Sequence, residues 1–257
     1  MSKAKTSIIW FRRDLRINDH PALLAAIESS EQIIPLFILD KQQIEEAGSK
    51  LLAYMGQSLR LLDESLGNKL HIIEGDQVEV LSTLIKKYEV QEVHISDEYE
   101  RFGAARDARV EAAGIKLVRT GSPYAVTPGR VVKPSDGTPY KVYTPFYKAW
   151  CAHGWRAPAV TPKKFNCVEP TAEYRAFPDF SMPEGVDVIQ AGEAAALKRF
   201  KEFTKNGLDS YDENRNFASI DGTSKMSTYL KFGEIHPRTL LQGLGESKAH
   251  DTFRKEI

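Results

Sequence analysis

The sequence predicts an α/β fold built on a doubly wound, Rossmann-like parallel sheet. Over the first 120 residues, short runs rich in β-branched residues alternate with amphipathic helical patterns. Strands that alternate with helices form a parallel sheet with helices on both faces, and right-handed crossovers wind the helices onto the two sides. No G-x-G-x-x-G follows the first strand, so the usual dinucleotide-binding fingerprint is absent.

Each element of this sheet is predicted from the period of its apolar residues. The strands are expected at 7–11, 33–39, 70–74, 92–96 and 116–119. The helices between them are expected at 21–29, 49–66, 78–88 and 104–113.

The chain changes character after residue 120. Ten prolines punctuate residues 121–187 and helical periodicity largely disappears, which predicts a long connector that wraps around the molecule without regular elements. From residue 188 the pattern turns helical again, and helices are expected at 191–203, 208–211, 227–232 and 237–244. Pro237 suits the first turn of the last of these.

The loop after the first strand is rich in charge. Arg12, Arg13, Asp14 and Arg16 lie where ligands bind in open α/β sheets. They could contact a cofactor, or they could form a charge network that holds the loop. We favour the network, because an Asp among three Arg residues can satisfy them locally.

A second polar segment precedes an apolar helical pattern. Gly222 lets the backbone turn, and Thr223, Ser224 and Ser227 bring three hydroxyls to the start of the helix expected at 227–232. Such a segment can cap the helix, or it can bind a phosphate through hydroxyls and backbone N–H groups.

The composition and the absence of several motifs limit the classes of function that the chain can have. Thirty-five basic residues balance 35 acidic ones, so the whole chain lacks the basic excess typical of nucleic-acid-binding domains, although a local basic surface is still compatible with DNA. No apolar run approaches a membrane span, and no export signal is evident. Cys151 and Cys167 are therefore interpreted as free thiols of a cytoplasmic protein. No metal-ligand spacing and no G-x-S-x-G elbow occur.

Three blocks of sequence resemble the DNA photolyase and cryptochrome family. The first runs from Ile8 to Leu23 and includes W-F-R-R-D-L-R, with His20 where the family usually has Asn. The second is Y-K-V-Y-T-P-F-Y-K-A-W from Tyr140 to Trp150, and the third runs from Tyr211 to Arg238, with T-S-K-M-S followed by G-E-I-H-P-R. The resemblance covers essentially the entire chain.

The resemblance implies three regions. Residues 1–125 correspond to an α/β antenna-chromophore domain, 126–187 to the interdomain connector, and 188–257 to the first part of an all-α FAD-binding domain. The final residues look like the start of a family helix that ends E-L-x-W-R. We therefore expect that the sequence is a fragment of a longer protein and that the fragment alone is inactive.

The resemblance also implies roles for single residues. Cofactor contacts fall on one tyrosine, one phenylalanine and the hydroxyl-rich run: Tyr211, Thr223, Ser224, Lys225, Met226, Ser227 and Phe253. Arg215 would contact a DNA phosphate. Glu256 would hydrogen-bond the flipped pyrimidine dimer and serve as the catalytic carboxylate.

The family's second chromophore is expected near residues 97–107. Phe102-Gly103 stands where folate-binding members often carry Asn-Glu, whereas some deazaflavin-binding relatives have a glycine there. The resemblance thus leaves both methenyltetrahydrofolate and a deazaflavin open.

The function implied is that of a class I photolyase: light-driven repair of cyclobutane pyrimidine dimers in DNA by electron transfer from reduced FAD. A cryptochrome, which uses the same flavin for blue-light signalling, is the first alternative. A free-standing α/β nucleotide-binding protein is the second, and the segment from Tyr211 to Arg238 argues against it. The expected partner is DNA that contains pyrimidine dimers, bound by a monomer.

Overall fold

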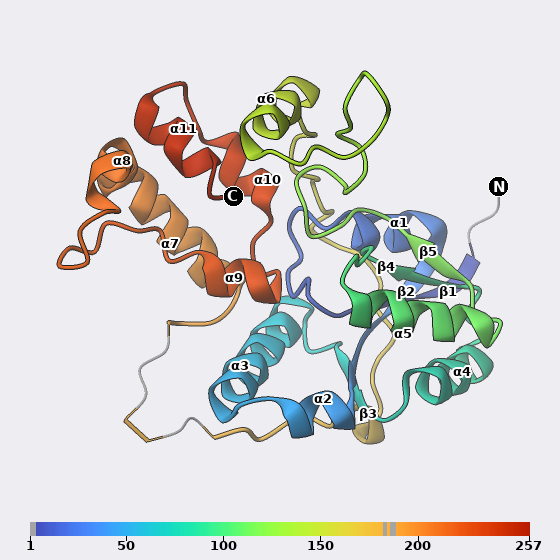
Figure 1. Cartoon of the computed structure of the whole chain (residues 1–257). Helices are drawn as coiled ribbons and strands as arrows, with labels where there is room; N and C mark the ends of the chain where they lie inside the picture. Colours follow the sequence, from blue (N-terminus) through green and yellow to red (C-terminus); the bar gives the residue numbers. More distant parts are fainter. Residues whose placement is uncertain (1–3, 182–183, 186–188) are drawn as a thin grey trace.

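The structure is a computed structural model that describes residues 4–181, 184–185 and 189–257 (Figure 1). Its centre is a five-stranded sheet in the order β3-β2-β1-β4-β5, in which every neighbouring pair is parallel. The strands are β1 (Ala4–Phe11), β2 (Ser30–Leu39), β3 (His71–Glu74), β4 (Glu92–Ile95) and β5 (Leu117–Arg119). The winding direction reverses between β1 and β4, which confirms the predicted doubly wound sheet.

Both faces of the sheet are buried. On β1, Ile9 and Phe11 enter one apolar cluster while Ile8 and Trp10 enter another, because successive side chains of a strand point to opposite faces. Helices α1 and α3 supply the first cluster and helices α4 and α5 the second. The helices of this part are α1 (Pro21–Ser29), α2 (Lys41–Glu46), α3 (Ser49–Ser65), α4 (Gln77–Tyr88) and α5 (Arg101–Ala112).

His20 sets the start of α1. Its Nδ1 accepts a hydrogen bond from the backbone N–H of Leu23 at 3.1 Å, and Pro21 follows at the first helical position. An imidazole nitrogen thus fills the capping role that a short polar side chain usually has. The replacement of the family's usual Asn by His20 is compatible with this helix start.

Two helices in the described residues before position 186 were not predicted. Helix α2 begins after Asp40, whose carboxylate accepts from the N–H of Gln43. Helix α6 (Tyr143–His153) interrupts the connector, so the prediction of a connector without helical elements was wrong there. Pro145 lies in the first turn of α6, where its missing N–H has no intrahelical partner to lose.

Beyond α6 the connector wraps as predicted. It pairs with β2 at Ile33↔Cys167 and with β3 at Ile72↔Arg175. Arg175 also forms a two-oxygen ion pair with Asp63 of α3, at 2.8 and 2.9 Å. The connector therefore covers β3, which would otherwise expose an unpaired sheet edge.

The C-terminal part is a helical unit with its own apolar cluster. Its helices are α7 (Glu193–Asn206), α8 (Tyr211–Asn214), α9 (Ser227–Phe232), α10 (Pro237–Gln242) and α11 (Lys248–Arg254), with 3-10 turns η1 (Ala172–Tyr174) before the unit and η2 (Leu208–Ser210) within it. Helix α7 was expected to begin at residue 191, two residues before its observed start. The expected boundary between the connector and the helical domain, between residues 187 and 188, lies outside the described residues.

Two carboxylates join this unit to the sheet unit. Glu234 is fully buried and accepts from Tyr54 Oη and Ser58 Oγ of α3, both at 2.6 Å, and from Gly192 N at 2.7 Å. Glu193 accepts from the backbone N–H groups of Ile17 and Asn18 at 2.9 Å. The helical unit is thereby held against the loop that follows β1.

Candidate functional site

Asp14 organises the loop at the carboxyl end of β1. Its carboxylate accepts from the backbone N–H of Arg12 at 2.8 Å and from Ser96 Oγ at 2.6 Å, and it lies 3.0 Å from His20 Nε2. Burial alone would raise the pKa of Asp14, but His20 and Arg12 outweigh it and hold this pKa well below its ordinary value. Asp14 is therefore an ionised anchor of the loop.

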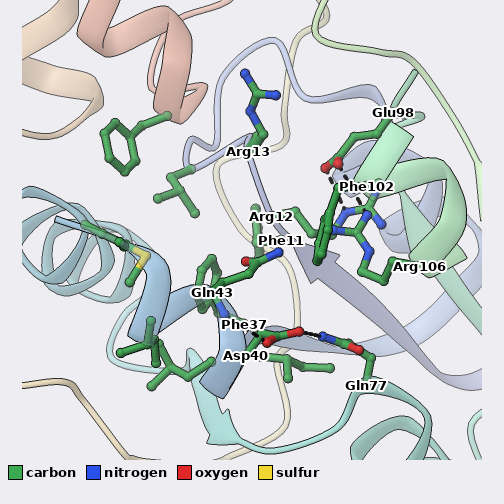
Figure 2. A pocket seen from close by; sticks show the side chains of 18 of the residues that line it. Phe11, Arg12, Arg13, Phe37, Asp40, Gln43, Gln77, Glu98, Phe102 and Arg106 are labelled. Carbon is green, nitrogen blue, oxygen red and sulfur yellow. Dashed lines mark hydrogen bonds and ion pairs between the residues drawn. The ribbon is translucent and has the colours of Figure 1, made fainter. Parts of the chain in front are cut away.

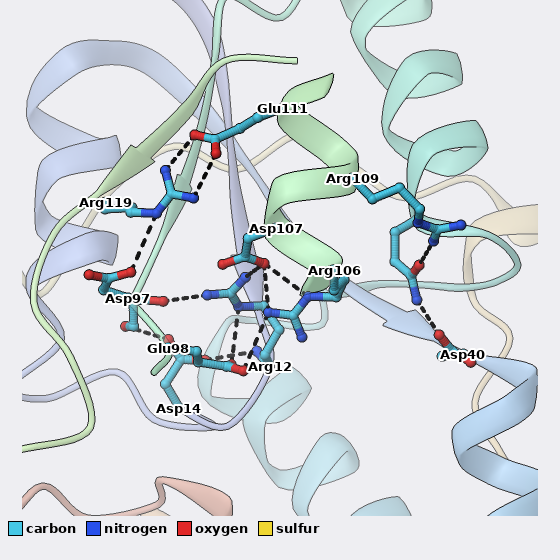
Figure 3. Close-up of polar contacts among 12 residues, drawn as sticks. Arg12, Asp14, Asp40, Asp97, Glu98, Arg106, Asp107, Arg109, Glu111 and Arg119 are labelled. Atoms are coloured by element: carbon cyan, nitrogen blue, oxygen red, sulfur yellow. Dashed lines mark hydrogen bonds and ion pairs between the residues drawn. The ribbon is translucent and has the colours of Figure 1, made fainter. Parts of the chain in front are cut away.

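Arg12 of this loop finds its partners on other elements (Figure 3). The Arg12 side chain pairs with Asp107 at 3.1 Å and Glu98 at 3.6 Å, and Arg106 of α5 shares both carboxylates. The expected charge network is present, but the expectation that Asp14 alone satisfies the arginines was wrong. Asp107 lies 95 positions after Arg12 in sequence, so the proximity of these two residues depends on the sheet order.

A cavity of about 360 Å³ opens beside this network (Figure 2). One wall is apolar and includes Phe11, Phe37, Met55 and Phe232, and the other carries charged and amide side chains. The polar wall includes Arg12, Arg13, Asp40, Gln43, Gln77, Glu98 and Arg106. A mostly apolar pocket with a few converging polar groups, at the point where the sheet reverses direction, is the usual form of a small-molecule site.

Gly103 shapes the polar wall. A Cβ atom at this position would collide with Oε2 of Glu98, so any larger residue would push that carboxylate away from Arg12 and Arg106. Arg12 Nε is buried and forms no hydrogen bond with a described residue. Its nearest carboxylate oxygen is Glu98 Oε1, at 3.6 Å.

The sequence argument missed Asp40 and Gln77. Both follow the carboxyl ends of strands, β2 and β3, and the Gln77 side chain bridges Asp40 to Arg109. With Arg106 and Phe102 they also line a second hollow of about 620 Å³. Their position directly after predicted strands is the signal that could have found them.

In the helical unit, Tyr211 and Phe253 pack edge to face. Their ring centroids are 5.2 Å apart at 83°, and Phe203 contacts both rings. Burial raises the pKa of Tyr211. Met226 belongs to the same apolar cluster, so three of the residues assigned to the cofactor lie together in its core.

Arg215 and Glu256 lie at the edge of this cluster. Arg215 Nη1 donates to Glu256 Oε1 at 2.6 Å, and its guanidinium carbon lies 5.4 Å from the centre of the Tyr211 ring. Both side chains are partly exposed, at 31% and 46%. The two residues assigned to DNA are thus brought together, but they bond each other.

The hydroxyl-rich segment, residues 223–227, does not form a simple helix cap. Helix α9 begins after Met226 without a side-chain cap, and Ser224 Oγ accepts only from Met226 N, at 3.4 Å. Thr223 and Ser227 are exposed, while Lys225 pairs with Asp221 at 2.8 Å. The interpretation as an ordinary Ser/Thr cap is therefore wrong, and two hydroxyls remain open to solvent.

Gly222 has a different role from the one expected. A Cβ atom there would lie 2.7 Å from the carbonyl oxygen of Asn214. The glycine is required by this close approach of α8, and its φ is not in the left-handed region. Among the described residues, no hydrogen bond or ion pair links this segment to Arg215 or Glu256.

Other site types find little support in residues 4–181, 184–185 and 189–257. No group of three or more His, Cys, Asp or Glu side chains there is arranged to hold a metal ion. No helix in this part has the length and apolarity that a membrane crossing requires. Cys151 and Cys167 are free thiols, and burial raises the pKa of Cys167 to about 12.

The fold and the cavity define a class: a doubly wound α/β unit with a ligand cavity at its switch point, joined to a helical unit. The sequence model of the DNA photolyase family matches residues 7–164. The chain belongs to the DNA photolyase family.

Individual relatives agree. The deoxyribodipyrimidine photo-lyase of Alkalihalophilus pseudofirmus is 34% identical over 97% of this chain. A class III photolyase from Agrobacterium tumefaciens superposes with a TM-score of 0.85 over the full chain at 29% identity, covering 57% of that protein. An archaeal photolyase from Sulfolobus tokodaii, solved with two FAD molecules, shares the fold with a TM-score of 0.82 at 22% identity over 98% of this chain and 56% of its own. The chain spans about half the length of the curated relatives it matches, 56% for the first.

Proposed function

We propose that this chain is part of a DNA photolyase, a lyase that uses light to repair cyclobutane pyrimidine dimers. The observation that carries the proposal is the convergence of four family-matched side chains, Tyr211, Arg215, Phe253 and Glu256, at one end of the helical unit. Membership of the photolyase family supports it. The proposed partner is DNA with pyrimidine dimers, bound by a monomer located in the cytoplasm.

FAD is the proposed redox cofactor, and it would supply the electron that opens the cyclobutane ring. The donor set fits its phosphates: Thr223 and Ser227 present exposed hydroxyls beside a helix start that no side chain caps. Lys225 already pairs with Asp221, so we assign phosphate binding to the hydroxyls first. Tyr211, Ser224, Met226 and Phe253 would form the buried floor beneath them.

Arg215 and Glu256 are proposed to divide DNA recognition. Arg215 would bind a backbone phosphate, and Glu256 would hydrogen-bond the flipped dimer and stabilise negative charge on it. Each must release the other to do so. An exposed ion pair of this kind is worth about 0–1 kcal/mol, so a phosphate can replace it.

The cavity beside Arg12 is proposed to hold the second, light-absorbing chromophore. Its apolar wall suits a flat ring, and its polar wall carries the Arg12 guanidinium that Glu98 and Asp107 hold in place. Because Phe102-Gly103 stands where folate-binding members often carry Asn-Glu, we favour a flavin or deazaflavin over methenyltetrahydrofolate. The archaeal photolyase that shares this fold was solved with two FAD molecules, which supports a flavin as the second chromophore.

We also propose that the regions 1–125, 126–187 and 188–257 act as chromophore domain, connector and the first part of the FAD-binding domain. The separate apolar clusters of the sheet and of the helical unit support this division.

Light-dependent repair tests the proposal. A protein that carries this chain together with the rest of the FAD-binding domain is incubated with FAD, a reductant and an oligonucleotide that carries one dimer, and the loss of dimer is compared in blue light and in the dark. Repair only in light supports a photolyase, and flavin binding without repair favours the cryptochrome alternative. Thr223→Ala/Ser227→Ala should weaken FAD binding, whereas Thr83→Ala on the exposed surface of α4 should not.

A further inference from the structure

Arg199 of helix α7 binds the backbone of the hydroxyl-rich segment, residues 223–227. Its Nε donates to the carbonyl oxygen of Ser224 at 3.2 Å, and its Nη2 donates to the carbonyl oxygen of Thr223, also at 3.2 Å. The same Nη2 lies 3.4 Å from the carboxylate of Asp221. One guanidinium therefore fixes two successive peptide groups of the segment, as its planar set of N–H donors allows.

The two bonds to Arg199 orient the N–H groups of the segment. In a planar trans peptide, the carbonyl oxygen of one residue and the N–H of the next point in opposite directions. Because the carbonyls of Thr223 and Ser224 point towards Arg199, the N–H groups of Ser224 and Lys225 point away from it. Neither N–H donates to a described residue, so both are available to an acceptor on a ligand.

Lys225 has a backbone conformation that suits an anion site. Its φ is +56°, in the left-handed region, which is uncommon for a residue other than glycine. Successive N–H groups beside a left-handed residue form the concave nests that bind anions. Such a conformation persists only where the surroundings fix it. Here they are the guanidinium of Arg199 and the ion pair between Lys225 and Asp221, at 2.8 Å.

The charges beside the segment favour an anionic ligand. Arg199 and Lys225 bring two positive charges, and both contact the single carboxylate of Asp221. These three side chains therefore leave an excess of one positive charge, which attracts a phosphate group.

We propose that Arg199 is a positioning residue for the phosphates of FAD and acts through the backbone that it holds. The N–H groups of Ser224 and Lys225 bind phosphate oxygens, together with the hydroxyls of Thr223 and Ser227. This inference rests on the proposed function, because it takes the hydroxyl-rich segment as the phosphate site. It adds a residue of α7, outside the segment, that prepares the site before the ligand arrives.

Two flavins separate this role from a structural one. FAD carries a diphosphate and riboflavin does not, although both have the same ring. A protein that carries this chain together with the rest of the FAD-binding domain is titrated with each, and quenching of flavin fluorescence measures binding. Arg199→Ala should weaken FAD binding roughly tenfold, as for the loss of one hydrogen bond to a charged group, and leave riboflavin affinity unchanged. A purely structural tie between α7 and the segment would weaken both flavins.

Two further variants make the comparison specific. Thr223→Ala/Ser227→Ala identifies the phase of FAD binding that belongs to the segment, since neither residue lines the cavity beside Arg12. Arg60→Ala is the matched control for Arg199→Ala. Arg60 Nη2 likewise donates to a backbone carbonyl, that of Pro178 at 3.1 Å, so its loss should change the affinity for neither flavin.

A pair of substitutions at Lys225 tests the backbone conformation and remains informative if Arg199→Ala does not fold. Lys225→Asn and Lys225→Val both remove the ammonium group. Asn is tolerated in the left-handed region, whereas β-branched Val is a true outlier there. Lys225→Val should therefore bind FAD roughly tenfold more weakly than Lys225→Asn, with equal affinities for riboflavin.

Unchanged FAD affinity of Arg199→Ala would overturn the inference, as would an equal loss for FAD and riboflavin. Equal FAD affinity of Lys225→Val and Lys225→Asn would also overturn it. If Thr223→Ala/Ser227→Ala leaves FAD binding unchanged, the phosphate site of the proposed function fails, and this inference fails with it. If that double variant weakens FAD binding and Arg199→Ala does not, only this inference is refuted.

Discussion

Arg215 donates a hydrogen bond to Glu256 across 2.6 Å, although 41 positions separate the two residues. The bond to Glu256 raises the pKa of Arg215, so the guanidinium remains charged at any physiological pH. Its positive charge is largely cancelled in the free protein. Contact with a DNA phosphate therefore competes with an internal partner.

This competition predicts opposite effects of the two residues on binding of undamaged duplex DNA. Arg215→Ala should weaken binding and lower the salt slope by about one unit, because one phosphate contact is lost. Glu256→Gln should strengthen binding, because it frees the Arg215 charge. Anisotropy titrations at several salt concentrations measure both. If the two variants shift affinity in the same direction, the ion pair does not control phosphate binding.

Glu234 predicts a pH dependence of stability. Burial raises its pKa above the ordinary 4.5, although bonds from Ser58, Tyr54 and Gly192 oppose the rise. The folded state therefore holds this proton more tightly than the unfolded state. Its contribution to stability is complete below pH 4.5 and is lost as the pH rises through the folded pKa.

Urea unfolding at a series of pH values measures this contribution. Glu234→Gln, which has no proton to lose, should show a flatter profile above pH 4.5 than the parent. Identical profiles of parent and variant would mean that Glu234 ionises freely in the folded protein.

The lowered pKa of His236 predicts that stability changes with pH in the opposite direction to the effect of Glu234. It is buried between Asp19 and Ser122, and burial lowers its pKa from 6.5 to about 4. The folded state resists protonation, so stability should fall as the pH drops from 6.5 towards 4, by roughly 3 kcal/mol at about 1.4 kcal/mol per pKa unit. His71 has a similarly low pKa, near 4, and contributes in the same window.

The difference between the parent and His236→Asn isolates the share of His236. An Asn side chain can still accept from the N–H of Arg238 at the start of α10, so the helix cap is kept. Thermal or urea unfolding between pH 4 and 6.5 should show a smaller loss in the variant. An equal loss would show that His236 is not the titrating group.

Gly233 predicts a large loss of stability at the contact between α9 and the loop after β1. Its φ is +67°, and a Cβ atom would collide with backbone atoms of Arg13 and Asp14. Backbone cannot swing aside as a side chain can, so Gly233→Ala should cost at least about 2 kcal/mol. Gly243→Ala, with no atom within 4 Å and a φ of −89°, is the matched control. Equal urea midpoints for the two variants would contradict the tight contact.

The local pattern of apolar residues was sufficient to predict the strands of the sheet. The apolar runs of the five strands and the amphipathic helices between them depend on neighbours in sequence, and all five strands occur where the periodicity indicated. Helix α6 was missed because it lies in a stretch of sequence interrupted by prolines, one of them in its own first turn, and none of its residues is buried. Its aromatic residues Tyr143, Phe146, Tyr147 and Trp150 do recur at helical spacing, but the surrounding prolines indicated an irregular connector.

The contacts that define the candidate sites came only from the tertiary structure. The sequence motifs identified Arg12, Arg215 and Glu256 as candidates. They did not indicate that Arg12 faces Glu98 and Asp107, or that Arg215 pairs with Glu256. The sequence by itself determined the periodicities and the family motifs, since both reside in neighbouring residues. The pairing of charges depends on strand order and on the docking of the helical unit, and those arise when distant apolar surfaces are buried together.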